Sequence, residues 1–313
     1  PALPEGWVYD QYEDTVPMAT YLVAFVISDY VFTEATSGLY RLPVRVYGPP
    51  HLINEKNGGQ FAADASAKVM DTLEVLFNQS YPMSKVDSVA IPRDYFGPGA
   101  MENWGLITYK DNYLMYYTGE SVEENRQQTA RVIVHEQTHQ WFGNLATIKW
   151  WSHIWLSEGF ATYFAAVGLN LVYPEFDQRR EFLVASVQKS MAFDVGPNEP
   201  IVNLEAEPDT ITSSTIIIYD KAASIIRMLE GFLGNETLIT SLRSYLNEYK
   251  FQSAEQDNLF KVMDNYAKNK IPEGKSFADV MNPWTTQPGY PLIRVSKVGG
   301  ANIYISQVSA TPI

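Results

Sequence analysis

The sequence predicts an α+β protein in which a β-rich part is followed by an α-rich part. Short runs of β-branched and aromatic residues, bounded by Pro and Gly, occupy much of the first 120 residues, and helical periodicity dominates the residues after them. The chain has 313 residues, of which 46% are hydrophobic, so it can bury a sizeable core. Intrinsic disorder and collagen-like repetition are therefore excluded.

The β-rich part begins with strands and contains one long helix. The expected elements are strands at residues 21–27, 42–47, 86–91 and 106–115 and a helix at residues 62–77. The helix is expected because Ala65, Val69 and Leu73 share one helical face. The cluster Gly48-Pro49-Pro50 interrupts these patterns, so we expect a domain boundary there.

Helix ends in the α-rich part are predicted from capping patterns. The capping-box pairs are Ser121 with Glu124 and Ser253 with Gln256. Gly234 is placed to end a helix that begins near Lys221. Residues 292–298 and 303–306 flank Gly299-Gly300 and predict a hairpin, which is marginal unless further strands join it. Since the first residues are neither an initiator Met nor a signal peptide, we expect the chain to belong to a longer protein.

Charge and cysteine content exclude several classes of protein. With 23 Lys and Arg against 36 Asp and Glu, the net charge of −13 would repel nucleic acids and anionic membrane surfaces. No apolar run reaches the length of about 18 residues that a membrane span requires. The chain has no Cys, so a disulfide scaffold, a thiol nucleophile and thiolate metal ligands are excluded. A transition metal would have to be held by His and carboxylate.

Two of the four histidines lie in the pattern His135-Glu136-Gln137-Thr138-His139. On a helix, His139 lies about 40° round from His135 and one turn along, so both imidazoles leave the same face and can reach one metal ion. Glu136 flanks that face, where a general base must stand to take a proton from water. The alternative is a chance string of solvated or core histidines.

A catalytic zinc site usually has three protein ligands, so a third is needed. Glu158 lies nineteen residues after His139 (158 minus 139), near the start of a helical stretch that ends before Pro174. A break at Gly143-Asn144 and a returning antiparallel helix would bring Glu158 beside the two histidines. The sequence therefore predicts a metal site made of His135, His139 and Glu158.

A Gly-rich segment precedes the strand expected at residue 106 and can be read together with the pattern at residues 135–139. Taken alone, it is an ordinary turn cluster. However, Gly99-Ala100-Met101-Glu102-Asn103 lies 36 residues before His135 (135 minus 99), and this combination resembles the aminopeptidase N family of gluzincin zinc metallopeptidases. Further matches are Gln140-Trp141-Phe142-Gly143-Asn144, Trp155-Leu156-Ser157-Glu158-Gly159-Phe160-Ala161, Trp284-Thr285-Thr286-Gln287 and Gly289-Tyr290-Pro291.

The resemblance covers nearly the whole chain and implies its organisation. Residues 49–288 would form a thermolysin-like catalytic domain, with a β-rich lobe followed by an α-helical lobe. Residues 1–48 would be the end of an N-terminal β domain, and residues 289–313 the start of a β-sandwich. His135, His139 and Glu158 would bind one Zn²⁺ per chain, and Glu136 would be the general base.

The resemblance also implies how substrate is held. Glu102 would bind the free α-amino group, while the backbone of Gly99, Ala100 and Met101, in a motif completed by Asn103, would lie along the first substrate residue. Tyr219 would support the oxyanion together with zinc. From the residues alone, a packed core tyrosine is the alternative, since the chain has twenty tyrosines, and Ala222 stands where the family commonly has Gly.

The predicted function is a zinc-dependent aminopeptidase that removes the N-terminal residue from peptides. An endopeptidase and a cell-surface binding protein on a peptidase scaffold are the alternatives. The resemblance implies a catalytic part on the extracellular side of the plasma membrane, with a cytoplasmic location as the alternative. Of the other two histidines, His153 is expected to be structural or to support the site without binding metal, and His51 to be exposed.

Overall fold

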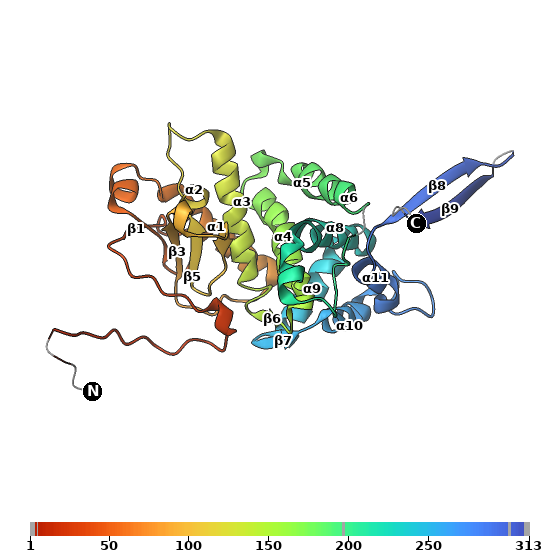
Figure 1. Ribbon diagram of the computed structural model, residues 1–313, viewed down its shortest axis with the longest axis horizontal. Helices are drawn as coiled ribbons and strands as arrows, with labels where there is room; N and C mark the ends of the chain where they lie inside the picture. The colour runs from red at the N-terminus through yellow and green to blue at the C-terminus, as the bar shows by residue number, and fades with distance from the viewer. Residues whose placement is uncertain (1–3, 5, 196–197, 300–301, 310–313) are drawn as a thin grey trace.

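A five-stranded mixed sheet forms the first part of the protein in the computed structural model, which describes residue 4 and residues 6–195, 198–299 and 302–309 (Figure 1). Its strands are β1 (Val31–Glu34), β2 (Val44–Gly48), β3 (Val86–Ile91), β4 (Ala100–Met101) and β5 (Leu106–Lys110). The spatial order is β1-β2-β3-β5-β4. Strands β2, β3 and β5 are parallel, and β1 and β4 are antiparallel at the two edges. Strand β4 therefore has one edge not paired within the sheet.

Helix α1 (Gln60–Phe77) covers this sheet and also packs against α3. Its alanines, among them Ala62, Ala63 and Ala65, are fully buried, and their small side chains let the helix lie close to its neighbours. It ends at Asn78, whose φ of 50° is left-handed, a conformation that Asn tolerates at a helix C-terminus.

Helices dominate the rest of the chain (Figure 1). They are α2 (Asp111–Leu114), α3 (Glu123–His139), α4 (Trp155–Val172), α5 (Gln178–Phe182), α6 (Lys189–Phe193), α7 (Pro208–Ser213), α8 (Ala222–Leu233), α9 (Asn235–Tyr249), α10 (Gln256–Ala267) and α11 (Phe277–Thr286). Short 3-10 or π-helical segments lie at Thr20–Leu22, His51–Glu55, Arg93–Tyr95, Trp151–His153, Pro174–Phe176, Leu183–Gln188 and Ile216–Lys221. The strands β6 (Ala146–Ile148) and β7 (Gln252–Ala254) form a parallel pair.

A stack of aromatic rings fixes α3 against α4. Phe142, just after α3, stacks on Phe160 of α4 with ring centroids 4.6 Å apart and an interplanar angle of 6°. Phe77 at the end of α1 meets Phe164 edge-on at 5.0 Å. One core therefore joins the helix that covers the sheet to the two central helices.

The predicted hairpin is formed by β8 (Pro291–Lys297) and β9 (Ile303–Ser309), and it projects from the helical body (Figure 1). Its predicted turn residue Gly300 lies outside the described residues. Apolar side chains on the hairpin, such as Leu292, Val295 and Ile305, are exposed. No helix among the described residues is both long and apolar enough to cross a membrane.

Most expected elements are confirmed, and the described residues are 51% helix and 14% strand, which agrees with a mixed α+β class. The strands near residues 42–47 and 86–91, the helix at 62–77 and the helix end at Gly234 are present. The strand expected at residues 21–27 is wrong: beyond a 3-10 turn the segment is irregular, because none of the described strands pairs with it. The strand expected at 106–115 ends at Lys110, where the short helix α2 begins.

Both predicted capping boxes are wrong. Helix α3 begins after Val122, and the Ser121 hydroxyl instead accepts a hydrogen bond from the Tyr117 N–H at 3.1 Å. The box at α10 is formed two residues later than predicted, by Glu255 and Asn258, because Ser253 is part of β7. The sheet also continues across the expected domain boundary, since β2 pairs with β3.

Candidate metal centre and active site

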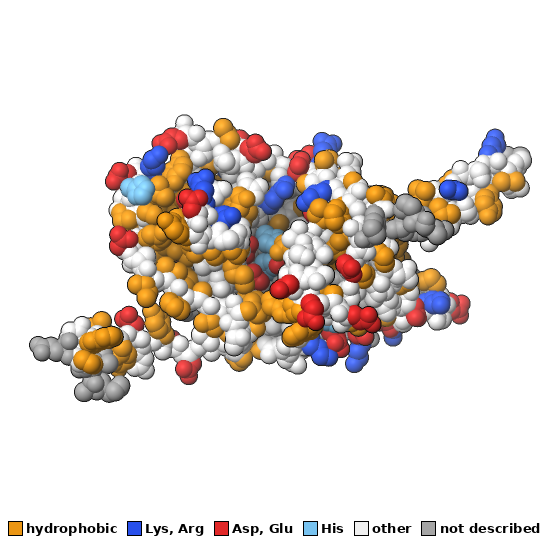
Figure 2. Space-filling view, in the orientation of Figure 1, with side chains coloured by type: hydrophobic (Ala, Val, Ile, Leu, Met, Phe, Trp, Pro, Cys, Tyr) orange, Lys and Arg blue, Asp and Glu red, His pale blue; other side chains and the backbone are white. Residues whose placement is uncertain are grey.

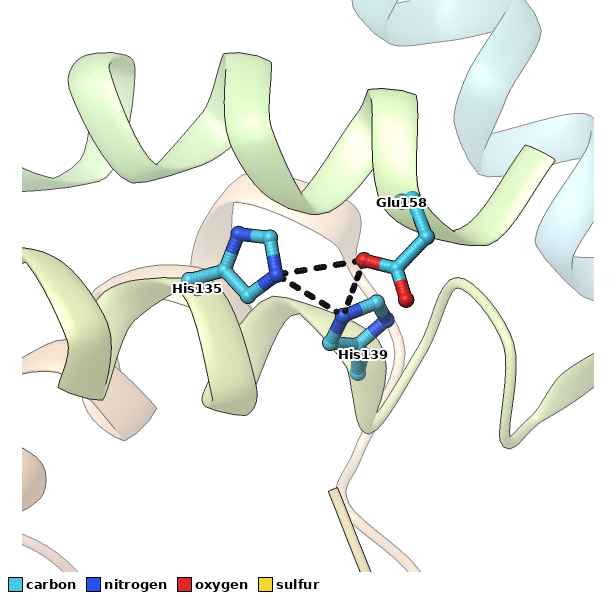
Figure 3. A group of neighbouring side chains, drawn as sticks. All are labelled: His135, His139 and Glu158. Atoms are coloured by element: carbon cyan, nitrogen blue, oxygen red, sulfur yellow. Dashed lines mark hydrogen bonds and ion pairs between the residues drawn. The ribbon is translucent and has the colours of Figure 1, made fainter. Parts of the chain in front are cut away.

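Three predicted ligands come together between α3 and α4. His135 Nε2 lies 3.1 Å from His139 Nε2, and Glu158 Oε2 lies 3.3 Å and 3.2 Å from these two nitrogens (Figure 3). The two imidazoles leave one face of α3 because they are four residues apart. Glu158 enters from the first turn of α4. The structure therefore brings together the three side chains that the sequence singled out.

The turn after α3 allows α4 to approach this closely. Gly143 has a φ of +116°, which side-chain-bearing residues rarely adopt. A Cβ atom at Gly143 would lie 2.2 Å from the Ser157 hydroxyl oxygen. Glycine is therefore required here, and it lets Ser157 reach the site next to Glu158.

The contacts of the second histidine select one tautomer of its neutral ring. His139 Nδ1 lies 2.8 Å from Ser157 Oγ and 3.2 Å from the Phe142 carbonyl oxygen. Since the Ser157 hydroxyl donates to the same carbonyl, its oxygen is free to accept from Nδ1–H. A carbonyl oxygen only accepts, so both contacts favour a proton on Nδ1. Nε2 of the neutral ring then directs its lone pair toward His135 and Glu158.

The spacing of the three donor atoms fits Zn²⁺. In a tetrahedral site with metal–ligand bonds of about 2.0–2.1 Å, neighbouring ligand atoms lie about 3.3 Å apart. The observed separations are 3.1, 3.3 and 3.2 Å. Two imidazoles and one carboxylate, with no thiolate in the chain, are also a donor set that zinc takes in hydrolytic sites. The residues present therefore fit the metal that the sequence predicts.

The charges around the donors favour a cation. Burial lowers the pKa of His139, but the carboxylates of Glu102 and Glu158 outweigh burial and raise this pKa to about 10. Burial raises the pKa of Glu158, but the charge of His139 and hydrogen bonds from both imidazoles outweigh it and give a net lowering. For His135 burial dominates and lowers the pKa. A divalent cation would supply the positive charge that these carboxylates attract.

Two further carboxylates border the metal site. One ligand atom each of Glu102, Glu136 and His139 lie within 4.8 Å of one another. Burial, together with the charges of Glu102 and Glu158, raises the pKa of Glu136 well above its usual range, against the effect of His139. Glu136 Oε2 is buried and has no hydrogen-bond partner among the described residues. That oxygen is available to take a proton inside the site.

The segment that carries Glu102 is held by the end of α3. Asn144 Nδ2 donates to the Glu102 carbonyl oxygen at 2.9 Å, and Gln140 Nε2 lies 3.4 Å from the same oxygen. Asn103 accepts from Thr108 at 2.9 Å and lies 3.4 Å from the Leu22 carbonyl oxygen. The Asn103 side chain thus contacts protein groups, and its hydrogen bonds position the segment.

Tyr219 lies beside His135, and both residues line the same cavity. Their rings are nearly parallel, with centroids 5.9 Å apart. Burial, then the charge of Glu158, raises the pKa of Tyr219, so its hydroxyl stays protonated and can donate a hydrogen bond. The π-helical segment that carries Tyr219 ends at Lys221, which forms a buried ion pair with Asp194 at 2.7 Å.

A cavity of about 360 Å³ opens beside these groups. His135, Glu136 and Tyr219 line it, together with Gly99 and Ala100. Figure 2 shows the molecule hollowed near its middle, with histidine side chains on the floor of the hollow. These five predicted site residues therefore face one accessible space.

Sequence reasoning missed several residues near the site. The Tyr21 hydroxyl lies 3.4 Å from the Gly143 carbonyl oxygen, and the nearby charges of Glu102 and Glu158, after burial, raise the pKa of Tyr21. Nothing distinguishes Tyr21 among twenty tyrosines in the sequence. The role of Ser157 was also missed, although the residue stands next to a predicted ligand.

The remaining histidines lie outside the cluster. His153 Nδ1 accepts from the Gln256 N–H at 3.4 Å, and its Nε2 lies 3.9 Å from Glu255. These contacts link the 3-10 segment before α4 to the start of α10. His51 is exposed, as predicted.

Comparison with known proteins identifies the family of the chain. The family described as "Peptidase family M1 domain" matches residues 61–284. The chain is 38% identical to the glutamyl aminopeptidase of Bitis rhinoceros, with 94% of this chain and 30% of the relative covered. It is 37% identical to aminopeptidase M1-B of Oryza sativa subsp. japonica (95% and 32% covered) and 38% identical to "Aminopeptidase 2, mitochondrial" of Saccharomyces cerevisiae (95% and 30% covered). The chain spans about a third of the length of these curated relatives, and it belongs to peptidase family M1.

Proposed function

We propose that the protein is a zinc-dependent aminopeptidase that hydrolyses the N-terminal peptide bond. The observation that carries the proposal is the buried carboxylate of Glu102 within 4.8 Å of Glu136 and His139. A carboxylate there is suited to bind an ammonium group, because a charge-assisted hydrogen bond is stronger than a neutral one. It would hold a chain terminus at the metal site.

His135, His139 and Glu158 would hold the metal. Bound zinc supplies Lewis acidity toward the scissile carbonyl and lowers the pKa of water. Glu136 accepts a proton from the attacking water at Oε2 and returns it to the leaving nitrogen. The Tyr219 hydroxyl donates a hydrogen bond to the oxyanion that develops on the carbonyl oxygen.

The edge strand β4 would orient the peptide. One edge of β4 pairs with β5, and its other edge pairs with no strand of the described sheet. A substrate that ran antiparallel to β4 would place its amine at Glu102 and its next residues toward Gly99. Backbone hydrogen bonds of this kind bind a peptide without regard to its side chains.

Assays of the full-length protein on alanyl and leucyl anilides, each with a free or an acetylated amine, test the proposal. We expect hydrolysis of the free-amine substrates and little hydrolysis of the acetylated ones. Glu102→Gln should abolish most of this difference by weakening hydrolysis of the free-amine substrates. Equal cleavage of blocked and free substrates would favour an endopeptidase and refute the aminopeptidase proposal.

We also propose the thermolysin-like two-lobe arrangement and the flanking β domains at residues 1–48 and 289–313. Exposed apolar residues on the β8–β9 hairpin support a covering partner at the second boundary. Because β2 pairs with β3, a first flanking domain that ends at residue 48 would share its last strand with the sheet of the catalytic body. Limited proteolysis of the full-length protein would locate these boundaries.

For the location, the extracellular side of the plasma membrane remains our proposal from the family resemblance. The name of the yeast relative refers to mitochondria. Surface labelling of cells that express the full-length protein distinguishes an extracellular from a cytoplasmic catalytic part.

A further inference from the structure

We infer that Arg131 selects substrates by binding a carboxylate on the residue that follows the scissile bond. This inference rests on the proposed aminopeptidase function and names a specificity that none of the assigned site residues provides. The carboxylate could belong to an acidic side chain at the second position or to the C-terminus of a dipeptide. Both sources present the same chemical group.

Arg131 lines the cavity beside the metal site, on the side away from Glu102. It precedes His135 by four residues on α3, so the two side chains leave the same face about 6 Å apart along the axis. The cavity is lined by His135 and Glu136, whereas Glu102 does not line it. A peptide whose amine is at Glu102 would therefore pass the metal donors before it reaches Arg131.

The edge strand β4 predicts the same direction for the bound peptide. Gly99 and Ala100 line the cavity, and Glu102 lies beyond the other end of β4. Consecutive residues of an extended peptide are about 3.3–3.6 Å apart. With the first residue between Glu102 and the metal donors, the second residue would lie beside Gly99 and the mouth of the cavity.

The guanidinium of Arg131 is held at one edge by an amide. Gln178 Oε1 accepts from Arg131 Nη2 at 2.7 Å and from Nε at 3.1 Å. Gln178 is buried, and its amide nitrogen donates to the Phe176 carbonyl oxygen at 3.3 Å, which orients Oε1 toward Arg131. These contacts use two of the five guanidinium N–H donors and leave three for a ligand.

No carboxylate among the described residues lies within 4 Å of the Arg131 guanidinium. The nearby Asp220 accepts from Ser186 at 2.9 Å and forms an ion pair with Lys189 at 2.6 Å. Glu181 is exposed and influences Arg131 only through its charge. A guanidinium is always charged, so a partly buried one without an ion-pair partner is suited to an anionic ligand.

The surroundings of Arg131 would strengthen such a contact. Apolar residues line much of the cavity near it: Val132, Ala165, Ala166, Phe182 and Ala185. Charges attract more strongly where apolar walls limit the access of water. The alternative is that Arg131 serves only to hold α5 against α3 through Gln178, and that role would not discriminate between charged and neutral substrates.

Two matched pairs of substrates test the inference on the full-length, zinc-loaded protein. The first pair, Ala-Glu-amide and Ala-Gln-amide, differs only in the side-chain charge of the second residue. The second pair, Ala-Ala and Ala-Ala-amide, differs only in the C-terminal carboxylate. We expect kcat/KM to be about tenfold higher for the anionic member of at least one pair, as a charge-assisted hydrogen bond predicts. The pair that shows the preference identifies the source of the carboxylate.

Arg131→Gln should bring that ratio close to one, and Arg131→Lys should retain part of it. Arg179→Gln is the matched control, because Arg179 lies on the neighbouring helix α5 and pairs with Glu230 outside the cavity. We expect this control to keep the wild-type ratio. If Arg131→Gln does not fold, the wild-type ratios and Arg131→Lys still decide the question.

Each result has a defined meaning. A wild-type ratio at or below one for both pairs overturns the inference, as does a ratio that Arg131→Gln leaves unchanged. The inference is also overturned if Arg131→Gln changes the kcat/KM ratio between N-terminal Glu and Gln anilides but leaves the ratios of the two matched pairs unchanged. In each of these cases, cleavage of the neutral substrates would still support the proposed aminopeptidase function. If the wild-type protein cleaves none of the substrates, the proposed function fails and the inference fails with it.

Discussion

Replacement of Ser157 by alanine tests how the second histidine of the proposed zinc site is held. The substitution removes the hydroxyl that lies 2.8 Å from His139 Nδ1 and leaves the Phe142 carbonyl oxygen at 3.2 Å. Loss of a hydrogen-bond partner of a metal-binding histidine weakens metal binding about 10- to 100-fold. Because one partner remains, we expect the lower end, about a tenfold weaker affinity or about 1.4 kcal/mol.

The assay is a zinc titration against a chromophoric chelator, with folding followed by circular dichroism. Ser241→Ala is the matched control, because Ser241 is a buried helical serine that donates to the Leu238 carbonyl oxygen far from the three donors along the chain. We expect this control to leave zinc affinity unchanged. A zinc affinity of Ser157→Ala within twofold of the wild type would refute the assignment of the Nδ1 proton and its role in holding the ring.

Four further predictions address catalysis, metal and stability. Glu136→Gln should keep one equivalent of zinc by elemental analysis and lower kcat about 10²- to 10⁴-fold, because it removes the proton acceptor; normal turnover would refute its role as base. Tyr219→Phe should lower kcat about 10²- to 10³-fold with little change in KM, because the hydroxyl donates to the oxyanion. A rise in KM as large as the fall in kcat would instead indicate that Tyr219 has a packing role. Asp194→Ala should destabilise the fold by about 3–5 kcal/mol in urea unfolding, because it leaves Lys221 charged and buried without its partner; a change under 1 kcal/mol would contradict this. Removal of zinc with a chelator should abolish activity and lower the melting temperature, because a ligand at about 1,000 times its dissociation constant stabilises the folded state by about 4 kcal/mol. Addition of Zn²⁺, but not of Mg²⁺, should reverse both effects.

The local chemistry of the site follows from spacing along the chain. A four-residue separation on a helix places His135 and His139 on one face whatever the rest of the protein does. The apolar periodicity of α1 and the alternation of buried and partly exposed residues in β2 are likewise properties of short segments. For this reason these elements appear where the sequence predicts them.

Segments whose structure depends on distant partners were predicted less well. The apolar run at residues 21–27 has strand composition, but a strand exists only where another strand can pair with it, and the sheet has its edge at β1. Ser121 and Ser253 have capping-box spacing, but the turn at Tyr117 and the β6–β7 pair compete for their backbone and hydroxyl groups. Local propensity gives way wherever tertiary contacts offer more hydrogen bonds.

The sequence by itself determined the family resemblance, the three donors of the proposed metal site and the excess of acidic residues. The tertiary structure decided the contacts that join residues far apart in the chain: Ser157 on His139, Asn144 on the Glu102 carbonyl, and Gln178 on Arg131. Spacing within one helix is set by backbone geometry alone. Contacts between helices depend on how the whole core packs, including the absence of a Cβ at Gly143, and a pattern of letters does not reveal them.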